Sequence, residues 1–171
     1  MKRLLLILAT TGATVTLAAC GSDASSESSD AAAGGSAETV AVQQIDGMGN
    51  VLVDSSGRAL YSPDEEASGT ILCVDACIQI WTPLAAEGTP TAAAGVVPLG
   101  VIDRPDGSKQ VTADGKPLYT FAQDAPGQVN GNNVTDEFGS QNFTWRAIVA
   151  DGSAATGTPD SGTNRGGYGG Y

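Results

Sequence analysis

The sequence predicts a mainly β protein, in which two tandem hairpin-based repeats form one small antiparallel β domain with one short helix. Three observations predict this fold class. Between residues 45 and 150, short runs of β-forming residues alternate with turn sequences that contain Gly. A stretch of the first half recurs 58 residues later in the second half. One segment, residues 73–81, has apolar residues at helical rather than strand spacing.

The first half opens with a hairpin sequence, "VLVDSSGRALY" at residues 51–61, in which Gly57 lies between two short β-forming runs. The segment "CVDACIQIW" follows. Its apolar positions leave Asp75 and Gln79 on the opposite side, which predicts a short helix that Thr82-Pro83 terminates. Residues i and i+4 of a regular helix lie near the long end of the Cα separation that a disulfide permits, so a turn or a distorted first helical turn is expected at Cys73 and Cys77.

The second half opens with "VPLGVIDRPDGSKQV", in which Pro105-Asp106-Gly107 predicts a tight turn between strands near Val101 and Val111. A hairpin at "QVTADGKPLYTF" comes next, and its Asp114-Gly115 pair suits a turn that requires positive φ. Along residues 118–121 the side chains alternate, so Leu118 and Thr120 should face one way while Tyr119 and Phe121 face the other. Residues 145–149 predict a closing strand.

The internal repeat is the strongest organising feature of the chain. At an offset of 58 the matching pairs are Gly49 and Gly107, Val53 and Val111, Gly57 and Gly115, Leu60 and Leu118, Tyr61 and Tyr119, Ala67 and Ala125, and Gly69 and Gly127. Arg58 falls on Lys116, and with six more residues in the second half Trp81 matches Trp145. We therefore expect a duplicated domain over residues 39–150, with repeat one at about 45–87 and repeat two at about 101–150, around one shared core.

Both ends of the chain differ from this domain. Residues 1–19 have a short basic start and an apolar run too short to span a bilayer comfortably, which predicts a lipoprotein signal peptide. Its end, "LAAC", predicts that Cys20 carries a lipid anchor of fatty acyl chains such as palmitate; an ordinary secretory cleavage site beside a cysteine is the alternative. Residues 20–38 predict a lipidated Cys followed by a flexible acidic linker, and residues 151–171 a disordered Gly-rich tail.

Composition excludes several kinds of function. Without Lys2 and Arg3 of the signal, six basic side chains remain against 19 acidic ones, a mature net charge of −13 that repels nucleic acid. The chain has no histidine, which excludes Ser-His-Asp and Cys-His catalysis and His-ligated metals. With Cys20 lipidated, Cys73 and Cys77 remain as a pair in an oxidising compartment. We expect a structural disulfide there, worth about 2 kcal/mol; a redox-active dithiol is the alternative.

The repeated residues resemble a bacterial family of predicted lipoproteins with a Tyr-x-aromatic-x-x-Asp motif, also described as a secreted repeat of unknown function. The second unit resembles the motif fully, with Gly115, Lys116, Leu118, Tyr119, Phe121 and Asp124. The first unit keeps Gly57, Arg58, Leu60 and Tyr61, but Pro63 replaces the aromatic residue and Glu66 the Asp. The stretch from Cys73 to Trp81-Thr-Pro is similar to one that follows the first unit in such proteins. The resemblance implies a cell-envelope lipoprotein and no known reaction.

The motif residues Tyr61, Glu66, Tyr119, Phe121 and Asp124 have two interpretations. They can be a binding site, in which the rings form a wall and the acid a polar handle, or they can be core residues whose acid accepts hydrogen bonds from backbone amides or a Tyr hydroxyl. The sequence favours the core, because aromatic pairs on one strand face are ordinary core residues. The acidic groups 64–66 and 136–137 lack the Asp-x-Asp-x-Asp-Gly spacing of a calcium loop, and nothing places two carboxylates at the separation that glycoside hydrolysis requires.

From these observations we expect an extracytoplasmic lipoprotein, anchored to the bacterial cell membrane, that is a non-enzymatic binding or interaction module. Its partners are the membrane, through the N-terminal lipid, and other envelope components. We expect no catalytic residue, no cofactor, no metal and no nucleic acid. The alternative function is small-molecule binding through Tyr119, Phe121 and Asp124.

Overall fold

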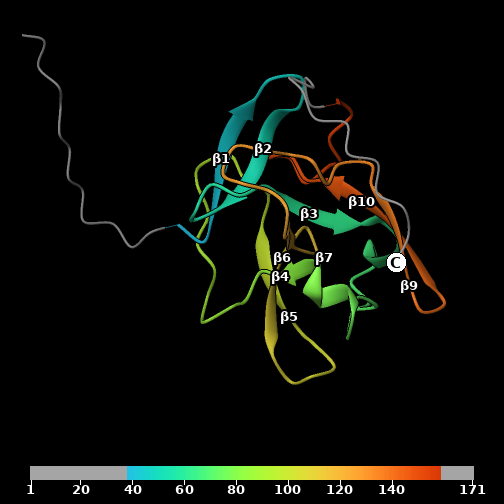
Figure 1. Cartoon of the computed structure of the whole chain (residues 1–171). Coiled ribbons are helices and arrows are strands. Elements are labelled where there is room, and N and C mark those ends of the chain that lie inside the picture. The colour runs from blue at the N-terminus through green and yellow to red at the C-terminus, as the bar shows by residue number, and fades with distance from the viewer. Residues whose placement is uncertain (1–37, 159–171) are drawn as a thin grey trace, which may run out of the picture. The chain divides into compact units, whose positions relative to one another are not determined.

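Ten strands and two 3₁₀ turns make up residues 38–158, the part of the chain that this computed structural model describes (Figure 1). The predicted signal peptide, Cys20, nearly all of the linker and residues 159–171 lie outside the described residues. Every ladder between strands is antiparallel, which confirms the predicted mainly β class. Within residues 38–158 no helix is long and apolar enough to cross a membrane.

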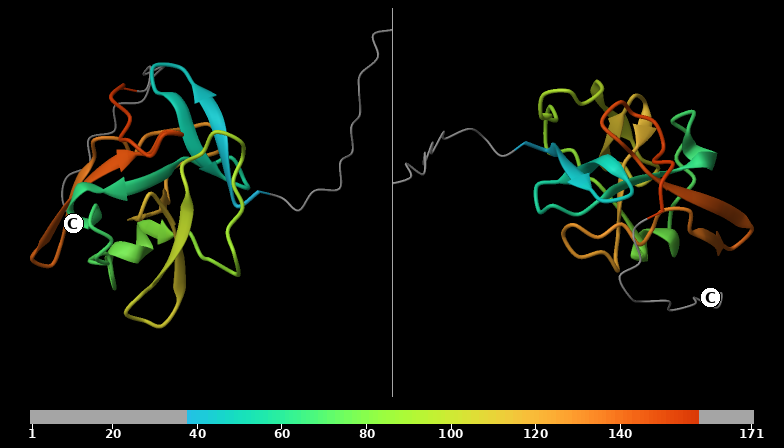
Figure 2. Two further views of the ribbon diagram at one scale, coloured as in Figure 1. Left: turned by 180° about the vertical axis from the view of Figure 1, so that it is seen from behind. Right: turned by 90° about the horizontal axis from the view of Figure 1, so that it is seen from above.

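The strands form three sheets. The largest has the order β4-β8-β3-β10-β9, with bounds β4 (Trp81–Pro83), β8 (Tyr119–Phe121), β3 (Leu60–Pro63), β10 (Gln141–Ala147) and β9 (Thr135–Phe138). A two-stranded ribbon contains β1 (Val40–Ile45) and β2 (Gly49–Asp54), and a three-stranded sheet contains β5 (Leu99–Asp103), β6 (Lys109–Ala113) and β7 (Lys116–Pro117). Seen from the front and from behind, the turns of the β1–β2 and β5–β6 hairpins lie at opposite ends of the domain (Figures 1 and 2).

At the centre of the large sheet, the two strands that contain the motif tyrosines, β3 and β8, pair with each other. Tyr61 of β3 lies opposite Tyr119 of β8, its counterpart 58 residues later. The strands on either side of this pair also align at equivalent positions. Pro63 of β3 pairs with Trp145 of β10, and Phe121 of β8 pairs with Trp81 of β4. Contacts at equivalent positions are thus related by a local two-fold axis between β3 and β8. The tandem duplication itself stays a prediction.

The predicted hairpins of the second half form as expected. β5 and β6 pair over their whole length, with Gly107 at φ +82° in the connecting turn. The β6–β7 turn contains Asp114 at φ 50° and Gly115 at φ 78°, which confirms the positive φ values predicted for this pair. The closing strand, β10, begins at Gln141, four residues earlier than the sequence predicts, and ends at Ala147.

The helix predicted over residues 73–81 is wrong. The segment contains only the 3₁₀ turn η2 (Cys77–Gln79), and a second such turn, η1 (Asp64–Glu66), follows β3. Asp75 adopts φ 50°, which interrupts any helix. At the other end, Trp81 is already in strand β4, because it pairs with Phe121. Sheet pairing and the short disulfide ring therefore override the helical apolar spacing.

The domain extends past the predicted boundary at Ala150. Ala155 is buried, and its N–H donates to the carbonyl of Ala147 at 2.8 Å. The carbonyl of Gly157 accepts a hydrogen bond from the Asn132 side chain at 2.9 Å. Residues 151–158 therefore pack against the domain, which corrects the prediction that a disordered tail begins at Asp151.

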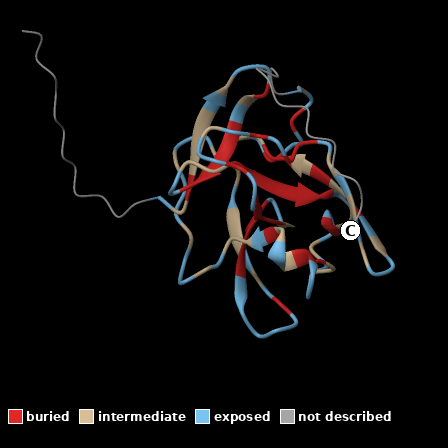
Figure 3. Ribbon diagram, in the orientation of Figure 1, coloured by how far each residue is buried: buried red, intermediate tan, exposed pale blue. Residues whose placement is uncertain are grey.

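Two clusters of buried side chains form the core, and β3 is buried along its whole length (Figure 3). Leu118 belongs to the aliphatic cluster, whereas Tyr119 and Phe121 belong to the aromatic one. This confirms the alternation predicted for residues 118–121. The strands of the motif thus separate two parts of the core, and the motif rings lie inside the aromatic part.

Close packing of this aromatic cluster gives a testable consequence at Gly131. A Cβ there would lie 2.7 Å from Cη2 of Trp81 and 3.1 Å from Cε1 of Tyr61. We expect Gly131→Ala to lower the free energy of unfolding by about 1–3 kcal/mol, measured by urea denaturation. The control is Gly88→Ala, where a Cβ meets nothing within 4 Å. Equal unfolding midpoints for the two variants would contradict the packing described.

Candidate functional site

The motif residues meet in the interior as two hydrogen-bonded pairs, and each pair joins the two halves of the domain. The hydroxyl of Tyr61 donates to Asp124. Reciprocally, the hydroxyl of Tyr119 donates to Oε2 of Glu66 at 2.7 Å. All four residues are buried. Each tyrosine therefore donates to the acid of the opposite half of the domain.

The second oxygen of each acid is bound in the same way in both halves. Oδ1 of Asp124 accepts from the N–H of Asn130 at 3.0 Å. Oε1 of Glu66 accepts from the N–H groups of Leu72 and Cys73, both at 2.6 Å. In each half the first of these amides lies six residues after the acid. The carboxylates thus fix both the opposite tyrosine and the loop that follows them.

The rings around these pairs form a column. Trp81 and Trp145 stack with centroids 3.9 Å apart and planes 8° apart. Phe121 stacks on the outer face of Trp81 at 4.4 Å, and Phe143 stacks on Trp145 at 5.6 Å. Phe143 therefore supplies the ring that the first motif lacks, where Pro63 replaces the aromatic residue.

Each tyrosine contacts the edge of one tryptophan in the column. Tyr61 meets Trp81 at 5.4 Å between centroids, and Tyr119 meets Trp145 at 5.2 Å, both in T-shaped arrangements. These are favourable geometries for aromatic pairs. Two phenols, two indoles and two phenyl rings thus make one continuous contact network in the core.

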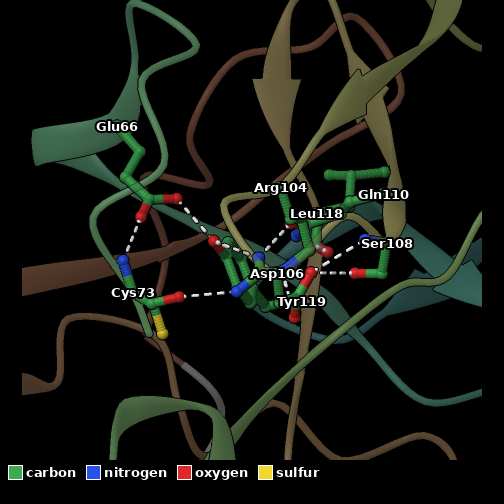
Figure 4. Close-up of polar contacts among 8 residues, drawn as sticks. All are labelled: Glu66, Cys73, Arg104, Asp106, Ser108, Gln110, Leu118 and Tyr119. Carbon is green, nitrogen blue, oxygen red and sulfur yellow. Dashed lines mark hydrogen bonds and ion pairs between the residues drawn. The ribbon is translucent and has the colours of Figure 1, made fainter. Parts of the chain in front are cut away.

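Arg104 is a member of the site that sequence reasoning missed (Figure 4). Its guanidinium is buried and donates to the Gln110 side chain, to the carbonyl of Cys73 at 2.7 Å and to the Tyr119 hydroxyl at 3.3 Å. Asp106 lies 3.8 Å from its Nε. One feature of the sequence could have indicated Arg104. The β5–β6 connection is longer than the β1–β2 turn and contains a basic residue.

The electrostatics follow from burial. Burial raises the pKa of the Tyr61 hydroxyl, and the charge of Asp124 raises it further. The pKa of Tyr119 is raised by burial first and then by Glu66, while Arg104 opposes the increase. Burial also raises the pKa of Asp124, against the hydrogen bonds that it accepts from Tyr61 and Asn130. Both phenols are therefore neutral hydrogen-bond donors to acids in the interior.

Cys73 and Cys77 form a disulfide whose Cα atoms lie 5.3 Å apart. Both residues are buried. The turn expected there is present, because the N–H of Cys77 donates to the carbonyl of Val74 at 3.0 Å. Arg104 and Glu66 bind the backbone of Cys73 from either side, so the disulfide loop is fixed to the motif network. Burial leaves its sulfur atoms little contact with an external thiol.

The acidic residues considered for calcium bind protein donors instead. Asp64 pairs with Arg146 at 3.0 Å, and Glu65 accepts from the N–H of Thr144 at 2.8 Å. Asp136 accepts from the indole N–H of Trp81 at 2.7 Å. Among the described residues, no group of three or more Cys, Asp or Glu side chains could hold a metal ion.

The small-molecule interpretation requires Tyr119, Phe121 and Asp124 to face a cavity. Their exposed fractions are 0%, 5% and 7%. A surface groove of about 400 Å³ lies near Met48, Asn50, Val149 and Asp151, and no motif residue lines it. The geometry therefore favours the core interpretation of the motif.

Comparison with known proteins agrees with the sequence resemblance. The family described as a secreted repeat of unknown function matches residues 100–139, which include Tyr119, Phe121 and Asp124. This confirms the resemblance for the second unit, and its description as secreted agrees with an extracytoplasmic location. No curated protein and no solved structure shows a significant match to the chain.

The buried acid gives a pH dependence of defined sign. Because the pKa of Asp124 is raised in the folded protein, its contribution to stability is complete below its ordinary value of 3.8 and is lost as the pH rises through the raised pKa. The free energy of unfolding of the wild type, relative to Asp124→Asn, should therefore fall as the pH rises from below 3.8. Urea denaturation at a series of pH values measures it.

The matched control is Asp151→Asn. Asp151 is exposed and accepts hydrogen bonds from Ser153, which lower its pKa. Its contribution should have the opposite sign: present above 3.8 and lost as the pH falls. If the Asp124 and Asp151 variants shifted the pH profile in the same direction, the assignment of Asp124 as a desolvated acid would be wrong.

Proposed function

We propose that this protein is a lipoprotein of the bacterial cell envelope, anchored by acyl chains such as palmitate on Cys20, whose β domain is a non-enzymatic binding or interaction module. The proposal of a non-enzymatic module rests on one observation: the motif residues bind one another inside the protein. Tyr61, Glu66, Tyr119 and Asp124 direct their hydrogen bonds to one another, to backbone amides or to Arg104. Binding is then left to the surface of a rigid scaffold.

The anchor is supported by the sequence at the end of the apolar segment. "LAAC" places small residues before Cys20, and 18 residues follow between this cysteine and the start of the domain, counted from Gly21 to Glu38. Fully extended, such a segment spans at most about 60 Å. A domain attached in this way can contact other components of the envelope without leaving the membrane. Stable attachment requires more than one acyl chain, which a diacylated or triacylated cysteine supplies.

The anchor is tested by Cys20→Ser in the full-length precursor. We expect the wild type to incorporate an alkyne analogue of palmitate and to sediment with membranes, whereas Cys20→Ser should incorporate none and be released. The Cys73→Ala/Cys77→Ala variant is the matched control, because it removes the other two cysteines and should still be labelled. Label that persists in Cys20→Ser, or an unlabelled wild type, would refute the anchor.

The scaffold role of the motif is tested with small molecules. Thermal unfolding of the mature chain is measured with metals, haem, quinones, sugars and peptidoglycan fragments. A compound at a hundred times its Kd should stabilise the native state by about 2.7 kcal/mol. We expect no stabilisation that depends on Tyr119. A compound that raises the Tm of the wild type but not of a folded Tyr119→Phe variant would make the motif a ligand site, and the alternative function would replace ours.

A further inference from the structure

The aromatic column has an arrangement that stabilises the product of a one-electron oxidation. Stacked indoles share the positive charge left when an electron is removed, and Trp81 and Trp145 overlap with centroids 3.9 Å apart. Tryptophan and tyrosine are the side chains of this column from which radical oxidants most readily take an electron. The two tryptophans of the chain are both in the column, and both are fully buried.

One tryptophan of the pair is connected to the surface. The indole N–H of Trp81 donates at 2.7 Å to Asp136, a half-exposed residue of the edge strand β9. The indole N–H of Trp145, in contrast, has no hydrogen-bond partner among the described residues. A negative charge beside its ring stabilises an oxidised Trp81, so Trp81 is the member of the pair that loses the electron.

The next step along the column is Tyr61, which contacts Trp81 at 5.4 Å between centroids. A phenol that loses an electron becomes a strong acid, so its oxidation is easy only when a base takes the proton at once. The hydroxyl of Tyr61 already donates to the carboxylate of Asp124. Proton transfer to a group within hydrogen-bond reach needs no rearrangement.

Tyr119 has a similar acid but a different charge beside it. The hydroxyl of Tyr119 donates to Glu66 and also accepts from the buried guanidinium of Arg104 at 3.3 Å. A positive charge at that distance opposes the removal of an electron from the ring.

Among residues 38–158, no buried cation donates to Tyr61, whose oxygen accepts from the N–H of Gly131 at 3.3 Å. The charge of Arg58 acts on Asp124, but Arg58 is 38% exposed and forms its ion pair with Asp54. The raised pKa of Asp124 also favours its protonation.

We propose that the column is a one-electron oxidation site that accepts oxidising equivalents from free radicals at Trp81 and stores them as a radical on Tyr61. The external radical gains one electron and Trp81 loses one. Tyr61 then reduces the Trp81 radical cation, its O–H bond breaks, and the proton passes to Asp124. The products are the reduced oxidant, a neutral phenoxyl radical and a carboxylic acid. The proposal is independent of the lipid anchor and of any partner.

The experiment uses the mature chain with Tyr168→Phe and Tyr171→Phe, so that Tyr61 and Tyr119 are its only tyrosines. Photogenerated sulfate radical is the oxidant, the sample is frozen, and the electron paramagnetic resonance spectrum is recorded. We expect a tyrosyl signal that narrows when the protein contains ring-deuterated tyrosine. The signal should be lost in Tyr61→Phe and retained in Tyr119→Phe.

A second variant keeps the ring and removes the proton acceptor. Asp124→Asn should lower the yield of tyrosyl radical at least about tenfold, because proton transfer supplies a factor of this size or more. Circular dichroism and the unfolding midpoint establish that each variant is folded. The proposal is overturned if the parent protein gives no tyrosyl signal, or if a signal survives Tyr61→Phe. Equal yields from the parent and a folded Asp124→Asn would also overturn it, and this comparison remains available if Tyr61→Phe does not fold.

Discussion

A carboxylate can be buried only when protein donors replace the water that it loses, and this constraint organises the domain. Glu66 and Asp124 each obtain one donor from a tyrosine of the opposite half. Backbone amides of their own half supply the rest, two to Glu66 and one to Asp124. The bonds between halves hold β3 beside β8, and this pairing brings Trp81 and Trp145 face to face. The core stacking and the sheet order therefore depend on the same two acids.

The two halves differ in what surrounds these bonds. Arg104 enters only beside the Tyr119–Glu66 pair, where it also binds the carbonyl of Cys73 and so joins the β5–β6 hairpin to the disulfide loop. Its counterpart on the other side is an uncharged backbone N–H, that of Gly131. The interior is thus nearly symmetric in shape and asymmetric in charge, because a buried arginine lies beside Tyr119 and a backbone amide beside Tyr61.

The β class, the turn at Asp114-Gly115 and the alternation along residues 118–121 could be predicted from the sequence. Turn chemistry and strand periodicity depend on only a few neighbouring residues. The helix at 73–81 failed for two reasons: Asp75 adopts a positive φ, and Trp81 pairs with Phe121, a residue distant in sequence. The motif residues were predicted as a set, but not their exchange between halves. Arg104 and Phe143 were missed, because the length of the β5–β6 connection and its basic residue do not show that the side chain turns into the core, and nothing beside Phe143 marks it as the partner of Trp145.

The pairing of Tyr61 with Tyr119 about a local two-fold axis has a consequence for how such chains can evolve and assemble. A chain with one copy of the motif would have a tyrosine and an acid that cannot reach each other, and an unpaired strand beside them. Two such chains could complete the same sheet as a symmetric dimer. Because one gene encodes both subunits of such a dimer, a substitution in one subunit is always present in the other. In the present chain the two halves have separate sequences, so each can vary on its own, and a substitution at a tyrosine or an acid must be compensated in the opposite half.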